Sequence, residues 1–242
     1  MTEYGLQLYS VRDITKENLD EALGKVAALG YKYVEFAGFF GHTAEEVKAM
    51  LDKHGLIISG THSPWTDLTP DKIWDTVAYH KAIGNPDYIV PHADLSTIEK
   101  IEAFAAVMNF AQPILAAAGI KLGYHNHSGE FKLMPWGSTI HSELEKRTNI
   151  HFELDTFWLF NAEVDPIMTM ERLKSRLHVI HVKDGHLGGK GESLGEGDAP
   201  VKAVREKALE MGLRMVVESE TLNPTGIEEV ERCIKYLRSL EK

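Results

Sequence analysis

Short apolar runs, rich in β-branched and aromatic residues, alternate with longer stretches of helical periodicity along the whole chain. In the first helical stretch, Leu19, Leu23 and Val26 recur at three- and four-residue steps, and Gly30 ends the run. Later helical stretches end in the same way, at Gly55, Gly84, Gly119 and Gly212. This alternation indicates repeated βα units around a parallel sheet.

The pattern predicts eight strands, with a helical stretch after each. They are Tyr4–Ser10, Tyr33–Ala37, Leu56–His62, Tyr88–His92, Lys121–His127, Ile150–Thr156, His178–Lys183 and Arg214–Glu220. Their ends recur roughly every 30 residues, which is the length of a βαβ crossover. Eight such units can close into a barrel, so we expect a single (β/α)₈ TIM-barrel domain over residues 1–242. An open doubly wound sheet is the alternative, but it usually has a glycine-rich turn after its first strand, where this chain reads Ser10-Val11-Arg12-Asp13.

Composition and charge narrow the class of protein. Hydrophobic residues make up 43% of the chain and charged residues 26%, as in soluble globular proteins. We find neither a membrane-spanning apolar run nor a signal peptide, and therefore expect a cytoplasmic location without membrane partners. The net charge of -10 would repel a phosphate backbone, which argues against nucleic acid as a partner. The single cysteine, Cys233, is expected to be a buried, unpaired thiol. For the oligomeric state we consider a homodimer, the commonest assembly of soluble proteins.

Polar side chains recur where the predicted strands end. Strands of a parallel barrel are buried, so such residues are expected at the C-terminal mouth, where barrel enzymes carry their catalytic groups. The main ones are Glu35, His62, His92, His125, His127, Asp155, His181 and Glu218. Any one of them could be structural, for example as a helix cap. Several unpaired polar groups converging without a cation would be costly, so the sequence predicts one divalent ion, with Mn²⁺, Zn²⁺, Mg²⁺ and Co²⁺ all compatible.

Seven motifs occur in a characteristic order along the chain. They are Gly5-Leu6-Gln7-Leu8-Tyr9-Ser10-Val11-Arg12-Asp13, Tyr33-Val34-Glu35-Phe36, Tyr124-His125-Asn126-His127 with Glu130-Phe131, Glu153-Leu154-Asp155-Thr156-Phe157-Trp158, His181-Val182-Lys183-Asp184, Gly195-Glu196-Gly197 and Val217-Glu218. With these motifs the chain resembles the xylose isomerase-like TIM-barrel superfamily, often labelled sugar phosphate isomerase/epimerase. The resemblance implies one metal ion, held at the ends of strands five to eight by His125, Asp155, His181 and Glu218.

Two positions depart from the pattern of that superfamily. Its ketose epimerases usually carry glutamate where this chain has His125, as a metal ligand and one of two opposed acid/base groups. We therefore expect altered chemistry here, with His127 as the nearest candidate for the partner base. Trp158 replaces a histidine that epimerases and abasic-site endonucleases tend to carry, which removes a ligand of a multinuclear cluster and disfavours a role in DNA repair.

The expected reaction is proton transfer on a keto-sugar or polyol through a metal-stabilised enediolate, as in sugar isomerases and epimerases. The resemblance and the strand-end positions suggest Glu218, His127, Glu130 and Lys183 as catalytic residues. Substrate contacts are expected from Glu35, His62, His92, Trp158 and His186. Trp65 offers a further apolar face, although packing in the core is its alternative.

Other functions stay open at this point. The same enediolate could expel a β-substituent, which would make the protein a lyase or dehydratase acting on a keto-inositol or a 3-keto-glycoside. A sugar-binding barrel without turnover is a third alternative. The Gly-dense region 185–197 is expected to be a mobile loop at the mouth, or else a solvated connection. Because it is the only glycine-rich candidate for a phosphate cradle, a non-phosphorylated sugar is favoured.

Overall fold

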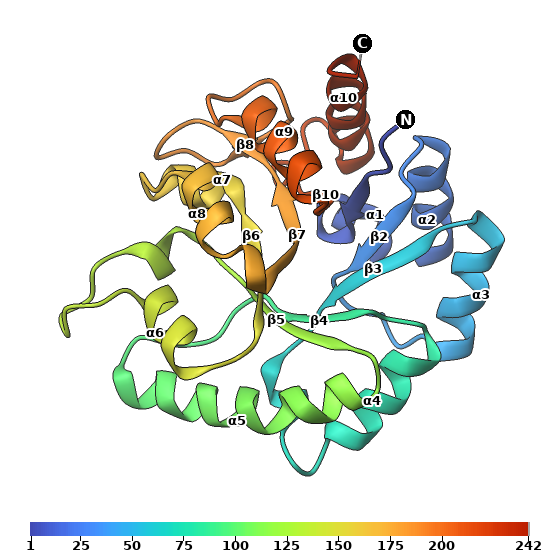
Figure 1. The fold of residues 1–242 in the computed structure, drawn as a ribbon. Helices are drawn as coiled ribbons and strands as arrows, with labels where there is room; N and C mark the ends of the chain where they lie inside the picture. The colour runs from blue at the N-terminus through green and yellow to red at the C-terminus, as the bar shows by residue number, and fades with distance from the viewer. Residues whose placement is uncertain (242) are drawn as a thin grey trace.

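The computed structural model describes residues 1–241; Lys242, the last residue of the predicted domain, lies outside the described residues. Eight parallel strands close into a barrel in the order β1-β10-β7-β6-β5-β4-β3-β2, with helices around it (Figure 1). The barrel strands are β1 (Gly5–Gln7), β2 (Tyr33–Phe36), β3 (Ile57–His62), β4 (Asp87–Val90), β5 (Lys121–His125), β6 (His151–Asp155), β7 (Leu177–Val182) and β10 (Arg214–Val217). The predicted (β/α)₈ barrel is confirmed.

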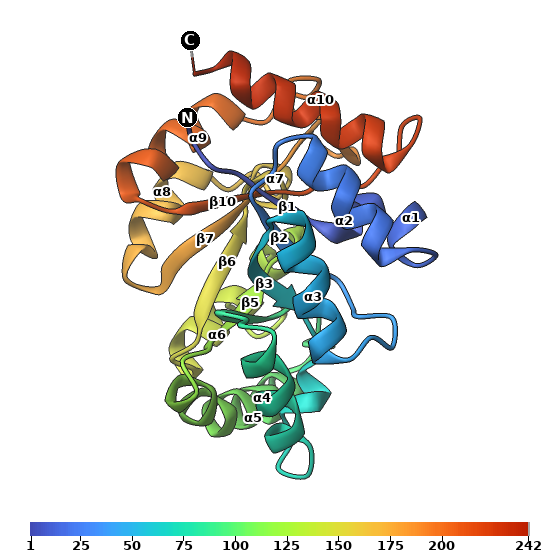
Figure 2. The same cartoon turned by 90° about the vertical axis from the view of Figure 1, so that its right-hand side faces the viewer.

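Helices follow the strands around the barrel. The α-helices are α1 (Arg12–Thr15), α2 (Leu19–Ala28), α3 (Ala44–His54), α4 (Ile73–Ala82), α5 (Ile98–Ala117), α6 (Ile140–Arg147), α7 (Thr156–Asn161), α8 (Pro166–Arg172), α9 (Val201–Met211) and α10 (Gly226–Ser239). Short 3₁₀ helices are η1 (Leu8–Val11), η2 (Trp65–Leu68), η3 (Ser128–Phe131) and η4 (Lys174–Arg176). The last helix, α10, packs against η1 and α1, which brings the two ends of the chain together (Figure 2).

Local sequence signals explain where the helices begin and end. Thr43 and Glu46 form a reciprocal capping box at the start of α3. Gly55 ends α3 with φ of 65°, and Gly212 ends α9 with φ of 67°, a left-handed conformation that glycine adopts without steric cost. The glycines that the sequence analysis took as helix stops therefore act as such.

The first and last barrel strands are shorter than predicted. The predicted first strand, Tyr4–Ser10, stops at Gln7, whose side-chain Oε1 accepts a hydrogen bond from Tyr9 N at 3.0 Å and turns the chain into η1. The predicted last strand, Arg214–Glu220, pairs with its neighbour only as far as Val217. The polar residues at these two ends therefore lie on the turns that follow the strands.

The barrel interior changes from apolar to polar toward its C-terminal end. Ile89, Val179 and Val216 form a small buried apolar cluster, separate from the main core between the sheet and the helices. Since side chains two residues apart on a strand point to the same face, His181 and Glu218 point into the interior above Val179 and Val216. The interior therefore carries chemically reactive groups toward the mouth.

The single cysteine is buried and unpaired on α10, as expected from the sequence. Burial raises the pKa of the Cys233 thiol to about 12, which leaves it in the unreactive thiol form at neutral pH. Within the described part of the chain, every helix is too short or too polar to cross a membrane.

Candidate metal centre and active-site cavity

Four side chains from adjacent strands meet at the mouth of the barrel. His125 and Asp155 are the last residues of β5 and β6, His181 lies near the end of β7, and Glu218 follows β10. One ligand atom from each lies within 4.8 Å of those from the other three, and all four side chains are buried. The structure thus brings together the four residues that the sequence analysis assigned to a metal ion.

The two carboxylate oxygens of Asp155 have different surroundings: one caps a helix, and the other is available as a ligand. Its Oδ1 accepts a hydrogen bond from Trp158 N at 2.8 Å and caps α7. Its Oδ2 is buried and has no hydrogen-bond partner within residues 1–241. Asn126 holds the Asp155 backbone, since its Oδ1 accepts from Asp155 N at 3.1 Å. The capping role and a ligand role are therefore compatible, because each uses a different oxygen.

The donor set fits a divalent cation. It offers two imidazole nitrogens and two carboxylate oxygens, a mixture found at zinc, manganese and cobalt sites. Burial lowers the pKa of His125 well below 6.5, so its imidazole is neutral and able to ligate. Burial would lower the pKa of His181 too, but Glu153, Glu35 and other carboxylates raise it well above 6.5. A bound cation would take the place of that imidazolium charge.

Lys183 supplies positive charge beside the four candidate ligands. It is fully buried, with Nζ 2.8 Å from Glu220 Oε2, 3.2 Å from Glu218 Oε2 and 3.8 Å from Asp155 Oδ2. The ammonium also lies 4.7 Å from the centre of the Trp158 ring. Burial alone would lower the pKa of Lys183, but the surrounding carboxylates raise it, so the side chain stays charged.

The same neighbours keep Glu218 ionised. Burial would raise the pKa of this carboxyl, but Lys183 and His181 outweigh that effect and lower it well below 4.5. For Asp155, burial dominates and raises the pKa to about 6. Glu218 is therefore ionised near neutral pH.

Beneath this group, two buried glutamates reach the same histidines. Glu35 Oε1 accepts from Gln7 Nε2 at 2.6 Å, and it lies 2.9 Å from His181 Nε2. Glu153 Oε2 lies 2.7 Å from His62 Nε2. Sequence analysis missed Glu153 as a site residue, although its two-residue spacing from Asp155 places both on the inner face of β6. Glu35, expected to contact the substrate, lies below His62 and does not line the cavity described next.

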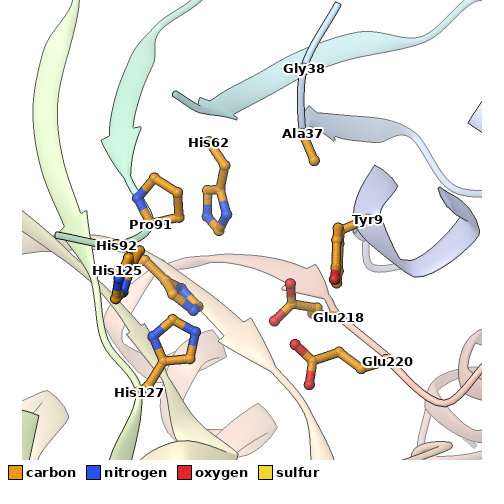
Figure 3. A pocket seen from close by; sticks show the side chains of 10 residues that line it. All are labelled: Tyr9, Ala37, Gly38, His62, Pro91, His92, His125, His127, Glu218 and Glu220. Carbon is orange, nitrogen blue, oxygen red and sulfur yellow. The ribbon is translucent and has the colours of Figure 1, made fainter. Parts of the chain in front are cut away.

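A cavity of about 410 Å³ opens at the mouth, where two of the four candidate ligands, His125 and Glu218, line it. Its lining residues are Tyr9, Ala37, Gly38, His62, Pro91, His92, His125, His127, Glu218 and Glu220. Figure 3 shows the imidazoles on one side of this cavity and the carboxylates of Glu218 and Glu220 facing them from the other. A substrate bound there would lie between imidazole and carboxylate groups. Tyr9 and Glu220 join the predicted residues; Glu220 follows Glu218 at the two-residue spacing that could have indicated it.

His127 is the predicted partner base, and Glu130 supports it. Glu130 Oε2 accepts from His127 N at 3.0 Å, while Glu130 Oε1 accepts from Tyr124 OH at 2.9 Å and lies 3.9 Å from His127 Nδ1. Partial burial would lower the pKa of His127, but Glu130 outweighs it and raises the pKa above 6.5. Because Glu130 is buried beneath this contact, it is placed to orient His127.

Of the other residues expected at the site, some lie at the cavity and others lie away from it. His92 lines the cavity, and the Trp158 ring lies 5.9 Å from that of His127. His186 is exposed, 2.6 Å from Asp198 Oδ2, and is not among the residues that line the cavity. Trp65 packs edge-on against Phe104 with ring centres 6.0 Å apart, which fits its core-packing alternative.

The glycine-rich segment after β7, expected as a mobile loop or a solvated connection, contains regular structure. It forms a small antiparallel hairpin of β8 (Asp184–Gly185) and β9 (Gly191–Glu192). The buried Asp184 carboxylate accepts hydrogen bonds from Gly195 N at 2.7 Å, Gly197 N at 3.2 Å and Ala199 N at 3.1 Å. A side chain at position 197 would collide with that carboxylate, which explains the glycine there.

The chain is similar in sequence and in structure to known proteins. A family model described as xylose isomerase-like TIM barrel matches residues 23–240. A 2-oxo-tetronate isomerase from Haemophilus influenzae is 27% identical over 195 residues, which cover 69% of this chain and 75% of that protein. Two structures of a sugar phosphate isomerase/epimerase from Parabacteroides distasonis have TM-scores of 0.86 and 0.81 at 24% and 25% identity. Each alignment covers 98% of this chain, and 98% and 93% of the two compared chains, respectively.

Proposed function

Because the chain belongs to the xylose isomerase-like TIM-barrel family, as its motifs predict, we propose that it is a divalent-metal-dependent isomerase or epimerase of a keto-sugar or a related sugar acid. The observation that carries this proposal is the meeting of four ligand atoms within 4.8 Å of one another, with two of the four residues, His125 and Glu218, lining the cavity. The names of the similar proteins, a 2-oxo-tetronate isomerase and a sugar phosphate isomerase/epimerase, support the same reaction class.

The residues that would hold the ion are His125, Asp155, His181 and Glu218. When bound, a divalent cation would polarise a substrate carbonyl and an adjacent hydroxyl, and so acidify the neighbouring C–H bond. The cavity is large enough for a single sugar, and its lining offers imidazole and carboxylate groups that hydrogen-bond hydroxyls.

Glu218 is assigned the proton transfer on one face of the substrate. Its contacts with His181 and Lys183 both go to Oε2, so Oε1 is the atom we assign to the moving proton. Its low pKa keeps the carboxylate in the ionised form that a general base requires. Lys183 holds Glu218 in place and balances negative charge that develops on the substrate oxygen.

We assign the proton transfer on the opposite face of the substrate to His127. Its ring lines the cavity opposite Glu218, and the neighbouring Glu130 favours its protonated form. A protonated His127 and an ionised Glu218 give one acid and one base, as epimerisation requires. We assign His62 and His92, which line the same wall, to the substrate hydroxyls.

Hydrogen exchange with solvent tests this proposal. We expect the Mn²⁺-loaded protein, screened against keto-sugars and 2-oxo sugar acids in D₂O, to incorporate deuterium at the carbon next to the carbonyl. We expect Glu218→Gln to lower that exchange by at least 100-fold. Release of water or an alcohol would instead assign the lyase alternative. Binding of a sugar without any exchange would contradict both and leave a binding protein.

A further inference from the structure

Both candidate histidine ligands lie next to buried carboxylates, and His181 faces them with both ring nitrogens. His181 Nδ1 lies 3.4 Å from Glu218 Oε2, on the cavity side. Its other nitrogen, Nε2, lies 2.9 Å from Glu35 Oε1 and 3.2 Å from Glu153 Oε2, on the barrel side. His125 Nδ1 lies 3.4 Å from Glu153 Oε2 but has no hydrogen-bond partner in the described structure. His181 is thus placed between an upper carboxylate, Glu218, and a lower pair, Glu35 and Glu153.

The two lower carboxylates, those of Glu35 and Glu153, are buried inside the barrel. Glu35 and Glu153 are both 0% exposed, on β2 and β6. Gly60 on the adjacent β3 makes room for Glu35, because a Cβ there would lie 3.0 Å from Glu35 Oε2. Two buried carboxylates are expensive to desolvate, and only hydrogen-bond donors or a cation nearby can compensate for them.

Two cation positions are conceivable, and they exclude each other. The upper one is the set already described, and the lower one would use His62, His125, Glu153 and His181. A neutral imidazole that binds an ion through one nitrogen carries its proton on the other, and that proton needs an acceptor. His125 and His181 can therefore serve only one of the two positions at a time.

Geometry favours the upper position. The nitrogens and oxygens around a zinc ion are about 3.3 Å apart, given bond lengths near 2.0 Å. His62 Nε2 and Glu153 Oε2 are only 2.7 Å apart, which is the distance of a direct hydrogen bond. The upper set instead contains Asp155 Oδ2, a buried oxygen without a hydrogen-bond partner in the described structure, and Glu218, which faces the cavity.

We propose that Glu35 and Glu153 are positioning residues of the metal centre. Glu35 accepts the Nε2 proton of His181, which directs the Nδ1 lone pair of that ring toward Asp155 and Glu218. Glu153 lies beside His125 Nδ1, at 3.4 Å, and fixes His62 through the 2.7 Å contact between Glu153 Oε2 and His62 Nε2. This inference rests on the metal centre of the proposed function, but not on the reaction carried out there.

Metal binding in the absence of any sugar tests the proposal. The variants are Glu35→Gln and Glu153→Gln, each titrated with Mn²⁺ by calorimetry after removal of bound metal. Loss of such an acceptor behind a ligating histidine typically weakens metal binding by 10- to 100-fold, so we expect that loss with a stoichiometry still near one ion per chain. Asp155→Asn, which changes a ligand, should abolish binding.

A matched control comes from the other end of the barrel. Asp87 is also buried and accepts from an imidazole, His178 Nε2, at 2.6 Å. Asp87→Asn should leave Mn²⁺ affinity within about twofold of wild type, since it removes a buried carboxylate–imidazole contact away from the ligands. Comparing unfolding of all variants without metal separates a loss of fold from a loss of positioning.

The tautomer of His181 gives a second readout. In the Zn²⁺-loaded protein, ¹⁵N spectra of the histidines should show a protonated Nε2 and a metal-bound Nδ1, and Glu35→Gln should broaden or shift those signals. Unchanged affinity and tautomer in both glutamate variants would overturn the proposal. So would binding that survives Asp155→Asn but is lost in Glu153→Gln, because the ion would then occupy the lower set. Normal metal binding without sugar turnover would contradict the proposed function alone.

Discussion

At the scale of single residues, Lys183 stabilises the buried carboxylates of the site, and this effect can be measured without any reaction. A lysine is rarely buried unless carboxylates surround it, and this one has three within 3.8 Å. We expect Lys183→Met to destabilise the metal-free protein by about 3–5 kcal/mol, because Asp155 and Glu218 would remain buried without their partner. Urea unfolding in the presence of a chelator measures this loss.

An exposed ion pair provides the control for that measurement. Lys235 and Glu231 pair on the surface of α10, where replacing Lys235 by Met should cost less than about 1 kcal/mol. A divalent ion should restore part of the stability lost in Lys183→Met, since it supplies positive charge to the same carboxylates. Equal stability of the two variants would show that Lys183 does not compensate the site.

The residues of the site differ in how readily the sequence reveals them. His125, Asp155, His181 and Glu218 could be predicted because they stand where buried strands end and match the motifs of the superfamily that the chain resembles. Glu153 has the same sequence signature as a core position of β6, and only its three-dimensional contacts with histidines on β3, β5 and β7 reveal its environment. Those contacts depend on barrel closure, which a linear pattern does not encode.

At the scale of elements, the β8–β9 hairpin depends on one carboxylate. Asp184 accepts backbone hydrogen bonds from Gly195, Gly197 and Ala199. A side-chain amide in its place would turn its own N–H group toward some of these backbone N–H groups. We expect Asp184→Asn to increase hydrogen–deuterium exchange over residues 185–199 by at least tenfold while α5 keeps its protection. Mass spectrometry of the exchanged peptides checks this.

The neighbouring Asp198 controls for the effect of charge alone. It lies on the same segment but pairs only with the exposed His186, so Asp198→Asn should leave exchange in the hairpin nearly unchanged. Equal exchange in the two variants would mean that the hairpin is held by other contacts. The hairpin escaped sequence analysis because its glycines suggested flexibility, whereas the buried acceptor that orders them, Asp184, is the first residue of β8.

A histidine on α4 makes stability depend on pH. His80 is buried between helix and sheet, its Nδ1 lies 3.0 Å from Asn85 Nδ2, and burial lowers its pKa from 6.5 to about 4. The unfolded chain therefore binds a proton between these values while the folded chain does not, so stability falls as pH decreases from about 6.5 to 4. His80→Phe should reduce that acid-induced loss by roughly 3 kcal/mol.

Urea unfolding of wild type and His80→Phe at several pH values measures the difference. Any constant offset from the lost contact with Asn85 cancels, because only the change between pH 7 and pH 4 is compared. Parallel pH profiles for the two proteins would contradict the assignment. His80 also packs edge-on against Tyr88 at 4.8 Å, which is why an aromatic replacement is the suitable one.

At the scale of the whole molecule, barrel closure links the candidate metal centre to global stability. The four candidate ligands come from β5, β6, β7 and the end of β10, which lie side by side in the closed sheet. The order of strands, and hence this adjacency, follows from the roughly 30-residue repeat that the sequence displays. Local unfolding of any of these strands would dismantle the set, so an ion bound there stabilises the barrel as a unit.

We therefore expect a divalent ion to raise the melting temperature of the chelated protein. A ligand at 100 times its dissociation constant stabilises the folded state by about 2.7 kcal/mol, which corresponds to roughly 5–10 °C for a domain of this size. Calorimetry with Mn²⁺ or Zn²⁺ measures the shift, and excess chelator should reverse it. Asp155→Asn should remove the shift, because its free oxygen is the ligand lost. A shift of the same size in that variant would place the stabilising ion elsewhere on the molecule.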